Sequence, residues 1–145
     1  MAARAGQGRR LGPAAAARRR PAAALSFERV TVGLLVRPAD APDLPEAEAN
    51  ALQDAHLAHL RSLADRGALL AAGPFRDQDD PSVRGIVLLG TSIDEGRELM
   101  APDPKVRAGL FEVRLATWIF PAGAVTFAPA EIPRSMAEAA ARLGG

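Results

Sequence analysis

The chain has 145 residues, of which 48% are hydrophobic and none is cysteine. That length allows one domain with one apolar core, and the lack of cysteine excludes disulfides and thiolate metal sites. The net charge of +1 hides an asymmetry, because residues 1–25 carry six arginines and no acid, whereas the rest of the chain has 12 basic and 17 acidic side chains.

Residues 1–26 form a basic segment rich in alanine and arginine. Its apolar stretch, residues 13–17, is too short for a signal peptide, and no apolar run in the chain approaches the ~20 residues that span a bilayer. We therefore expect a disordered arm on a cytoplasmic protein without membrane contact, and we favour a targeting arm less. Nucleic-acid binding is not favoured either, because it would depend on this arm alone while the rest of the chain is acidic.

The first predicted element is a strand over residues 28–37, where apolar side chains recur with a period of two. A helix is predicted to follow over residues 46–66. Asp43 precedes Glu46 by three residues in the pattern of a capping pair, and Gly67 is placed to end the helix in the left-handed conformation. One stripe of this helix carries Leu52, His56, His59, Leu60 and Leu63.

Two further strands are predicted over residues 68–75 and 85–90. The turn between them, residues 76–84, is rich in aspartate but lacks the glutamate and central glycine of a calcium-binding EF-hand loop, so we interpret it as a solvated turn. Ser92 and Glu95 then form a capping-box pattern that opens a short helix, in which one glycine is a weak point.

The last predicted strand covers residues 110–120. The resulting order, β-α-β-β-α-β, is that of the split βαβ plan. We therefore predict an α+β domain over residues 27–121 with a ferredoxin-like βαββαβ fold. Right-handed crossovers place both of its helices on one face of a four-stranded antiparallel sheet.

The other face of the predicted sheet has no helix over it, although we expect it to carry Leu35, Trp118 and part of residues 85–90. An apolar sheet face is rarely left in water. We therefore predict a homodimer in which two such faces pack together as a barrel-like sandwich. The rival cover is the C-terminal extension, residues 122–145, of which residues 135–143 are expected to form a marginal short helix.

Four short motifs occur in a fixed order along the chain. They are His56-Leu57-Ala58-His59-Leu60, Gly67-Ala68-Leu69, Gly73-Pro74, and Asp103-Pro104 followed by Gly109. As an ordered set they resemble the YCII-related (YciI-like) domain family, over about two thirds of the chain. The resemblance implies a dimeric α+β barrel, a histidine–aspartate pair in a cleft, and acid–base chemistry, including elimination, on small acidic or phenolic molecules. It implies no metal and no organic cofactor.

Two positions depart from the pattern of the family. Gln53 stands three residues before the histidine, where many relatives have an arginine, and Lys105 stands after Asp-Pro, where many have an aromatic residue. If that arginine binds a substrate anion in relatives, Gln53 cannot supply the charge. Lys105 and Arg107 are the cations that could replace it.

The candidate catalytic residues are His56 and Asp103. His56 lies on the apolar stripe, and the predicted topology brings Asp103 toward the same half of the helix, where a carboxylate would orient the imidazole for proton transfer. The candidate substrate-binding residues are Gly73, Pro74, Trp118 and Lys105. No metal site is expected, since the two histidines lack zinc-ligand spacing.

Less specific interpretations stay open for the two histidines and for Asp103. His56 and His59 are both compatible with packed side chains on a helix, and Asp103 directly before a proline is a good helix cap. The function that follows from the resemblance is a small cofactor-independent lyase or isomerase. The alternative is a non-catalytic dimeric domain that binds a small ligand or a protein.

Overall fold

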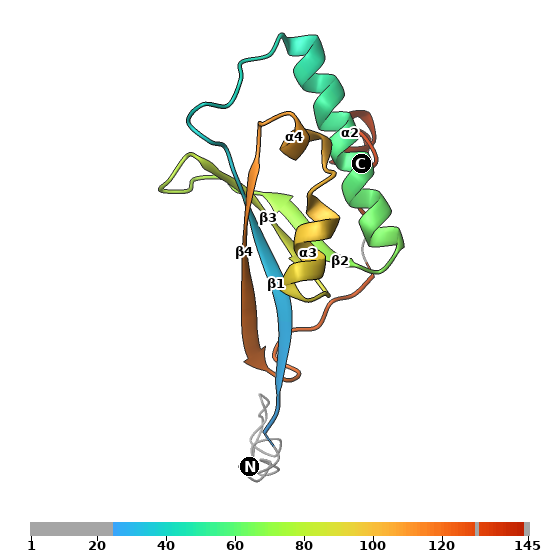
Figure 1. Cartoon of the computed structure of the whole chain (residues 1–145). Helices are drawn as coiled ribbons and strands as arrows, with labels where there is room; N and C mark the ends of the chain where they lie inside the picture. Colours follow the sequence, from blue (N-terminus) through green and yellow to red (C-terminus); the bar gives the residue numbers. More distant parts are fainter. Residues whose placement is uncertain (1–24, 130, 144–145) are drawn as a thin grey trace, which may run out of the picture.

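The computed structural model describes residues 25–129 and 131–143 (Figure 1). The expected basic arm, residues 1–26, lies outside the described residues except for Leu25 and Ser26. In chain order the elements are β1 (Phe27–Val36), α2 (Glu46–Asp65), β2 (Leu69–Pro74), β3 (Val83–Leu89), α3 (Ile93–Met100), α4 (Pro104–Arg107), β4 (Glu112–Pro121) and α5 (Met136–Leu143).

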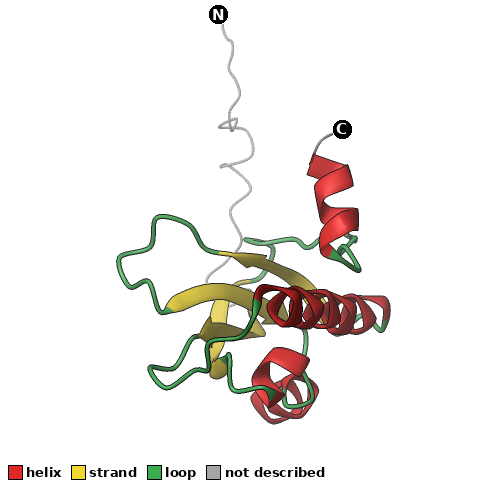
Figure 2. Cartoon of the chain, turned by 90° about the horizontal axis from the view of Figure 1, so that it is seen from above, coloured by secondary structure: helices red, strands yellow, loops and turns green. Residues whose placement is uncertain are grey.

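The four strands form one antiparallel sheet in the order β2-β3-β1-β4. Helices α2 and α3 cover one face of it (Figures 1 and 2). This is the strand order of the β-α-β-β-α-β plan, so the predicted ferredoxin-like α+β fold is confirmed. Within the described part of the chain, no helix is both long and apolar enough to cross a membrane.

The two main helices begin and end for different local reasons. The prediction that Asp43 caps α2 is wrong, because the cap position is Pro45, which makes no side-chain bond, while Asp43 instead lies 3.5 Å from Arg37 in an exposed ion pair. Gly67 has the predicted left-handed conformation, with φ of 78°. The predicted capping box of α3, in which Ser92 and Glu95 bond each other's backbone, is also confirmed.

The glycine in α3, Gly96, is buried and not merely a weak point of the helix. A Cβ at this position would lie 3.2 Å from both Leu89 of β3 and Thr31 of β1. The bare backbone therefore lets α3 approach the sheet closely.

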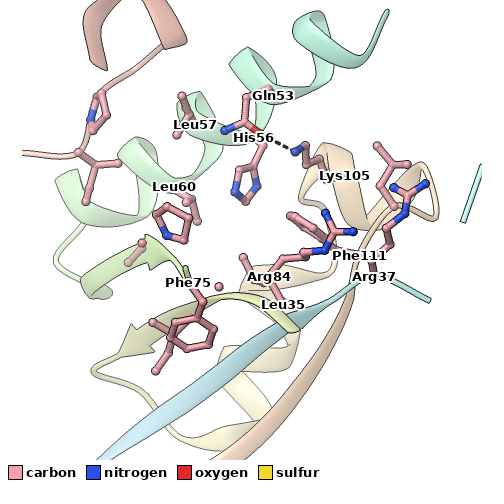
Figure 3. Close-up of a pocket in the computed structure, with 18 residues that line it drawn as sticks. Leu35, Arg37, Gln53, His56, Leu57, Leu60, Phe75, Arg84, Lys105 and Phe111 are labelled. Carbon is pink, nitrogen blue, oxygen red and sulfur yellow. Dashed lines mark hydrogen bonds between the residues drawn. The ribbon is translucent and has the colours of Figure 1, made fainter. Parts of the chain in front are cut away.

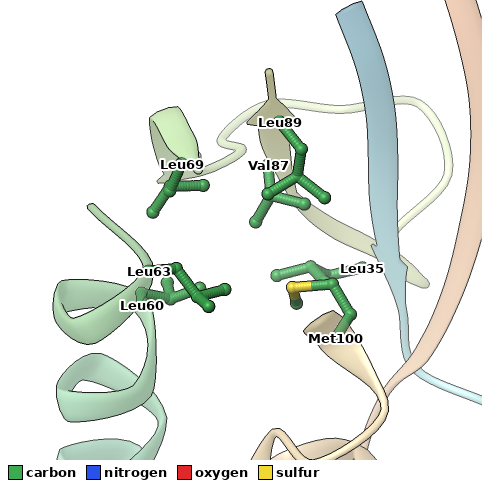
Figure 4. Packing of buried hydrophobic residues seen from close by; sticks show 7 residues of the cluster. All are labelled: Leu35, Leu60, Leu63, Leu69, Val87, Leu89 and Met100. Atoms are coloured by element: carbon green, nitrogen blue, oxygen red, sulfur yellow. The ribbon is translucent and has the colours of Figure 1, made fainter. Parts of the chain in front are cut away.

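The core lies between the helices and the sheet (Figure 4). Its fully packed members are Leu35, Leu60, Leu63, Leu69, Val87, Leu89 and Met100. The prediction that Leu35 lies on the open face is therefore wrong. Gly33 pairs with Val87 in the sheet, and residues two apart on a strand share a face, so Leu35 points with Val87 toward the helices.

The opposite sheet face is built from the alternate residues of the same strands. Val32 pairs with Leu88 and Leu34 with Ile86, which makes this face apolar, and Trp118 lies on it as predicted. Trp118 is 40% exposed. We call this surface the open sheet face.

The helix of the C-terminal extension does not lie on the open sheet face, so the prediction that this helix covers it is wrong. Its helix α5, which corresponds to the predicted segment 135–143, lies beside α2. The backbone N–H of Met136 donates to the carboxylate of Asp54 at 2.8 Å, which ties the start of α5 to α2.

Candidate functional site

The centre of the candidate site is a buried pair, His56 from α2 and Asp103 from the turn between α3 and α4. The Nδ1 atom of His56 lies 2.7 Å from Oδ2 of Asp103. The side chains are only 7% and 0% exposed. An ionised carboxylate only accepts hydrogen bonds, so when it pairs with a neutral imidazole, Nδ1 donates and the lone pair is on Nε2.

Asp103 also caps α4, as its position directly before a proline suggested. Its second oxygen, Oδ1, accepts a hydrogen bond from the backbone N–H of Lys105 at 2.8 Å, and Pro104 occupies the first turn. One oxygen is held by the helix start while the other holds His56. The carboxylate is therefore fixed relative to the backbone, which orients the imidazole.

The imidazole is held from a second side by an aromatic ring. Phe111 meets the ring of His56 edge to face, with centroids 5.6 Å apart and an angle of 75°. Such a contact restricts ring rotation without occupying either nitrogen. Among the described residues, the hydrogen bond to Asp103 is the only one that His56 makes through its ring, which leaves Nε2 available to a ligand.

A cleft of about 530 Å³ opens beside His56 (Figure 3). Its wall is apolar along α2, β2 and the C-terminal extension, and it carries three cations, Arg37, Arg84 and Lys105. None of the residues that line it is acidic. Figure 3 shows the imidazole pointing into the space between the apolar residues and the two arginines.

Lys105 is the only lysine of the chain. Its ammonium donates a hydrogen bond to the side-chain oxygen of Gln53 (Figure 3) and lies 4.9 Å from the centroid of Phe111. Burial lowers the pKa of Lys105, and the nearby cations Arg84 and Arg37 lower it further, while Asp103 opposes the shift. Close positive charges disfavour one another, and an anion between them would relieve that repulsion.

The other predicted site residues divide into two groups. Gly73, Pro74 and Lys105 line the cleft with His56. Trp118 does not line it, so its expected place in the pocket wall is wrong, because strand pairing turns this side chain to the open sheet face.

His59 lies one turn beyond His56 and has a structural contact. Its Nε2 atom lies 2.9 Å from the backbone oxygen of Leu99, which joins α2 to α3. Within the described parts of the chain, no group of three or more histidine, aspartate or glutamate residues is arranged to hold a metal ion.

Sequence reasoning missed several residues of the cleft wall. They are Arg37, Arg84, Phe111, Ile132 and Pro133. Arg37 directly follows β1 and Arg84 is the second residue of β3, and they come to the same end only through the antiparallel pairing of these strands. Ile132 and Pro133 lie in an extension with no strong pattern of its own.

Comparison with known proteins shows one family and structural likeness to solved chains. The model of the YCII-related domain matches residues 34–119. No curated protein matches the chain. A solved structure of 5-chloro-2-hydroxyhydroquinone dehydrochlorinase from Burkholderia phenoliruptrix, in complex with 2,5-dihydroxybenzoquinone, is 21% identical, with a TM-score of 0.41 over 64% of this chain and 91% of that chain.

Proposed function

The chain belongs to the YCII-related domain family, and from that premise we propose that it is a small cofactor-independent enzyme in which His56 transfers protons and Asp103 orients it. The observation that carries this proposal is the 2.7 Å hydrogen bond from buried Asp103 to His56, whose side chain lines the cleft. A histidine held in this way has one nitrogen fixed and one available, as a general base requires.

The proposed reaction begins with removal of a proton from a carbon next to an electron-withdrawing group. Nε2 of His56 takes the proton, and the electron pair left on carbon forms a double bond. In an elimination, the leaving group departs with its own bonding pair. In an isomerisation, the imidazolium returns the proton to another atom of the same molecule. Asp103 stabilises the imidazolium in both cases.

The proposed substrate is a small organic acid or a phenol. The cleft presents Arg37, Arg84 and Lys105 and no acidic side chain, so it favours an anionic molecule. Arginine suits a planar carboxylate in particular, because its guanidinium can donate two parallel hydrogen bonds. The negative charge that develops on the substrate during proton removal would be stabilised by the same cations.

A homodimer through the open sheet face is part of this proposal. This face carries Val32, Leu34, Ile86, Leu88 and Trp118. Packing two copies face to face would remove these side chains from water, which is the main favourable contribution to association. Much of the cleft wall comes from α2 and from Leu35 on the helix side of the sheet, while Ile86 of the open sheet face lines it as well.

The alternative function is a binding domain that holds a small anion without converting it. Gln53 favours it, because many family members place an arginine at this position. The two functions share the fold and the cations, and differ in whether His56 performs chemistry.

One experiment decides between them. A panel of small carboxylic acids and phenols is incubated with the protein in D2O, and NMR follows loss of carbon-bound hydrogen and any elimination product. We expect His56→Ala to lose the activity by about 10²–10⁴-fold, the usual contribution of general acid–base catalysis. His59→Gln, which changes a histidine outside the cleft, should keep it. Wild-type rates in a folded His56→Ala variant would refute catalysis by His56 and favour the binding domain.

A further inference from the structure

The end of the chain reaches the cleft although it lies beyond the residues that match the family. We call residues 131–143 the C-terminal strap. Two of its side chains, Ile132 and Pro133, line the cleft, whereas the family match ends at residue 119. Ile132 also packs against the hydrophobic core. A segment outside the common domain therefore supplies part of the wall of the site.

Two hydrogen bonds hold the strap to α2. The carboxylate of Asp54 accepts from the backbone N–H of Met136 at 2.8 Å, and the guanidinium of Arg61 donates to the backbone oxygen of Ile132 at 3.0 Å. Positions 54, 57 and 61 share one face of the helix by their spacing. Leu57, which lines the cleft, therefore lies between the two anchors of the strap.

The strap also has internal order that keeps its shape. The side chain of Ser135 caps α5 by accepting from the backbone N–H of Glu138 at 3.1 Å. Arg142 reaches back to Glu131 at 2.6 Å and to Glu138 at 3.6 Å. Exposed ion pairs of this kind contribute little stability one by one, so the two anchors on α2 and the packing of Ile132 are the contacts that decide where the strap lies.

We propose that the C-terminal strap is a specificity-determining wall of the cleft, which selects anionic ligands that carry an apolar body. The proposal rests on the proposed function for the anionic class of ligand. The three cations would bind the charged group, and Ile132 with Pro133 would pack against the opposite, apolar end. Because apolar surface is buried only where the ligand reaches the strap, a larger flat ring system should gain more from this wall than a small one.

The position of the strap can be tested without any ligand. The chain has no cysteine, so Leu57→Cys introduces a single thiol under the strap. We expect its reaction with N-ethylmaleimide to become about tenfold faster when Asp54→Ala and Arg61→Ala are added, since each lost hydrogen bond makes local opening easier. Glu98→Cys, exposed on α3, is the control, and its rate should not respond to the two added substitutions.

Selectivity is tested by calorimetry with benzoate and 2-naphthoate. Wild-type protein should prefer 2-naphthoate, and Ile132→Ala should lower that preference by about tenfold, the effect of a small change in an apolar pocket. Arg134→Ala, a change on the exposed side of the strap, should leave it unchanged. The proposed role of the strap would be refuted if Ile132→Ala changed the affinity for both acids equally. It would also be refuted if the labelling rate of Leu57→Cys did not change when Asp54→Ala and Arg61→Ala were added. If wild-type protein binds neither acid, the proposed anionic ligand class is wrong, and so is the proposed selectivity. The thiol labelling rates still test the position of the strap in that case.

Discussion

Lys105 donates a hydrogen bond to the side chain of Gln53, a residue 52 positions earlier in the chain. These are the two positions at which the sequence departs from the usual pattern of its family, and they meet at the wall of one cleft. A positive charge that an arginine at position 53 would bring from α2 is instead brought by Lys105 from α4. The two departures therefore lie in contact, and Lys105 places a cation at this point of the cleft wall.

This coupling predicts a rescue. Lys105→Met should weaken binding of salicylate by about tenfold or more, as expected for loss of a hydrogen bond to a charged group. Adding Gln53→Arg should restore much of the affinity, because its guanidinium can reach the position of the lost ammonium. Titration calorimetry measures both. Arg107→Ala is the matched control, since Arg107 is an exposed cation on the same short helix that does not line the cleft; an equal loss in that variant would point to general electrostatics.

Two substitutions of Asp103 are predicted to affect the stability of the fold differently while both reduce turnover. Asp103→Ala removes the cap of α4 and the partner of His56 together, so we expect the free energy of unfolding to fall by about 2–4 kcal/mol. Asp103→Asn keeps a good cap but presents an amide to Nδ1, and should cost less stability. Both variants should lose most turnover, by up to about 10²–10⁴-fold.

Urea unfolding and turnover of the same samples check this prediction. An Asp103→Asn variant with full turnover would show that the carboxylate does not orient His56. Conversely, an Asp103→Ala variant as stable as the wild type would show that neither oxygen contributes to folding.

The alkaline stability of the protein should report on a single side chain. The chain contains no cysteine and no tyrosine, and Lys105 is its only lysine. Lysine is therefore the only side-chain type in this chain whose ordinary pKa lies between about pH 9 and 11. Burial lowers the pKa of Lys105 from 10.5. The unfolded chain therefore binds more protons in the window just below pH 10.5, and the free energy of unfolding rises with pH there.

Below the lowered pKa of folded Lys105 the amine is charged in both states, so this rise disappears. Urea unfolding at a series of pH values measures the slope. Lys105→Met should abolish it. A slope of the opposite sign, or one that persists in the variant, contradicts burial of the ammonium as its cause.

Oligomeric state is predicted to depend on the open sheet face. Trp118→Glu places a charge among the apolar residues of that face, and burying an unpaired charge in an interface is costly. Light scattering after gel filtration should give a dimer mass for the wild type and half that mass for the variant. Glu98→Ala, on the helix side of the molecule, is the control. A monomeric wild-type protein would rule out the proposed homodimer.

Much of the fold follows from patterns that act within a few residues. The period of two in β1, the stripe of α2, the capping box at Ser92 and the left-handed Gly67 each depend on local geometry, so the sequence alone predicts these elements and their order. That order is enough for the strand arrangement, because crossover handedness leaves few alternatives. The ordered motifs also identify the family.

What the sequence could not decide is which face each strand turns inward. In β1 the regular apolar set, Val32 and Leu34, lies on the open sheet face, whereas the helices cover Thr31 and Leu35, so the period of two favoured the wrong face. Register in a sheet is determined by packing across all four strands, and a shift of one residue exchanges the faces. The same register turns Trp118 away from the cleft.

The candidate site divides in the same way. His56 and Asp103 are predictable because the family motif names them and the topology brings their elements to one end of the sheet. Arg37 and Arg84 become neighbours only through the antiparallel pairing of β1 with β3, and Ile132 reaches the cleft only because the chain returns to α2 after its last strand. Local periodicity determines the elements, but contacts between residues far apart in the chain determine which side chains share a cleft.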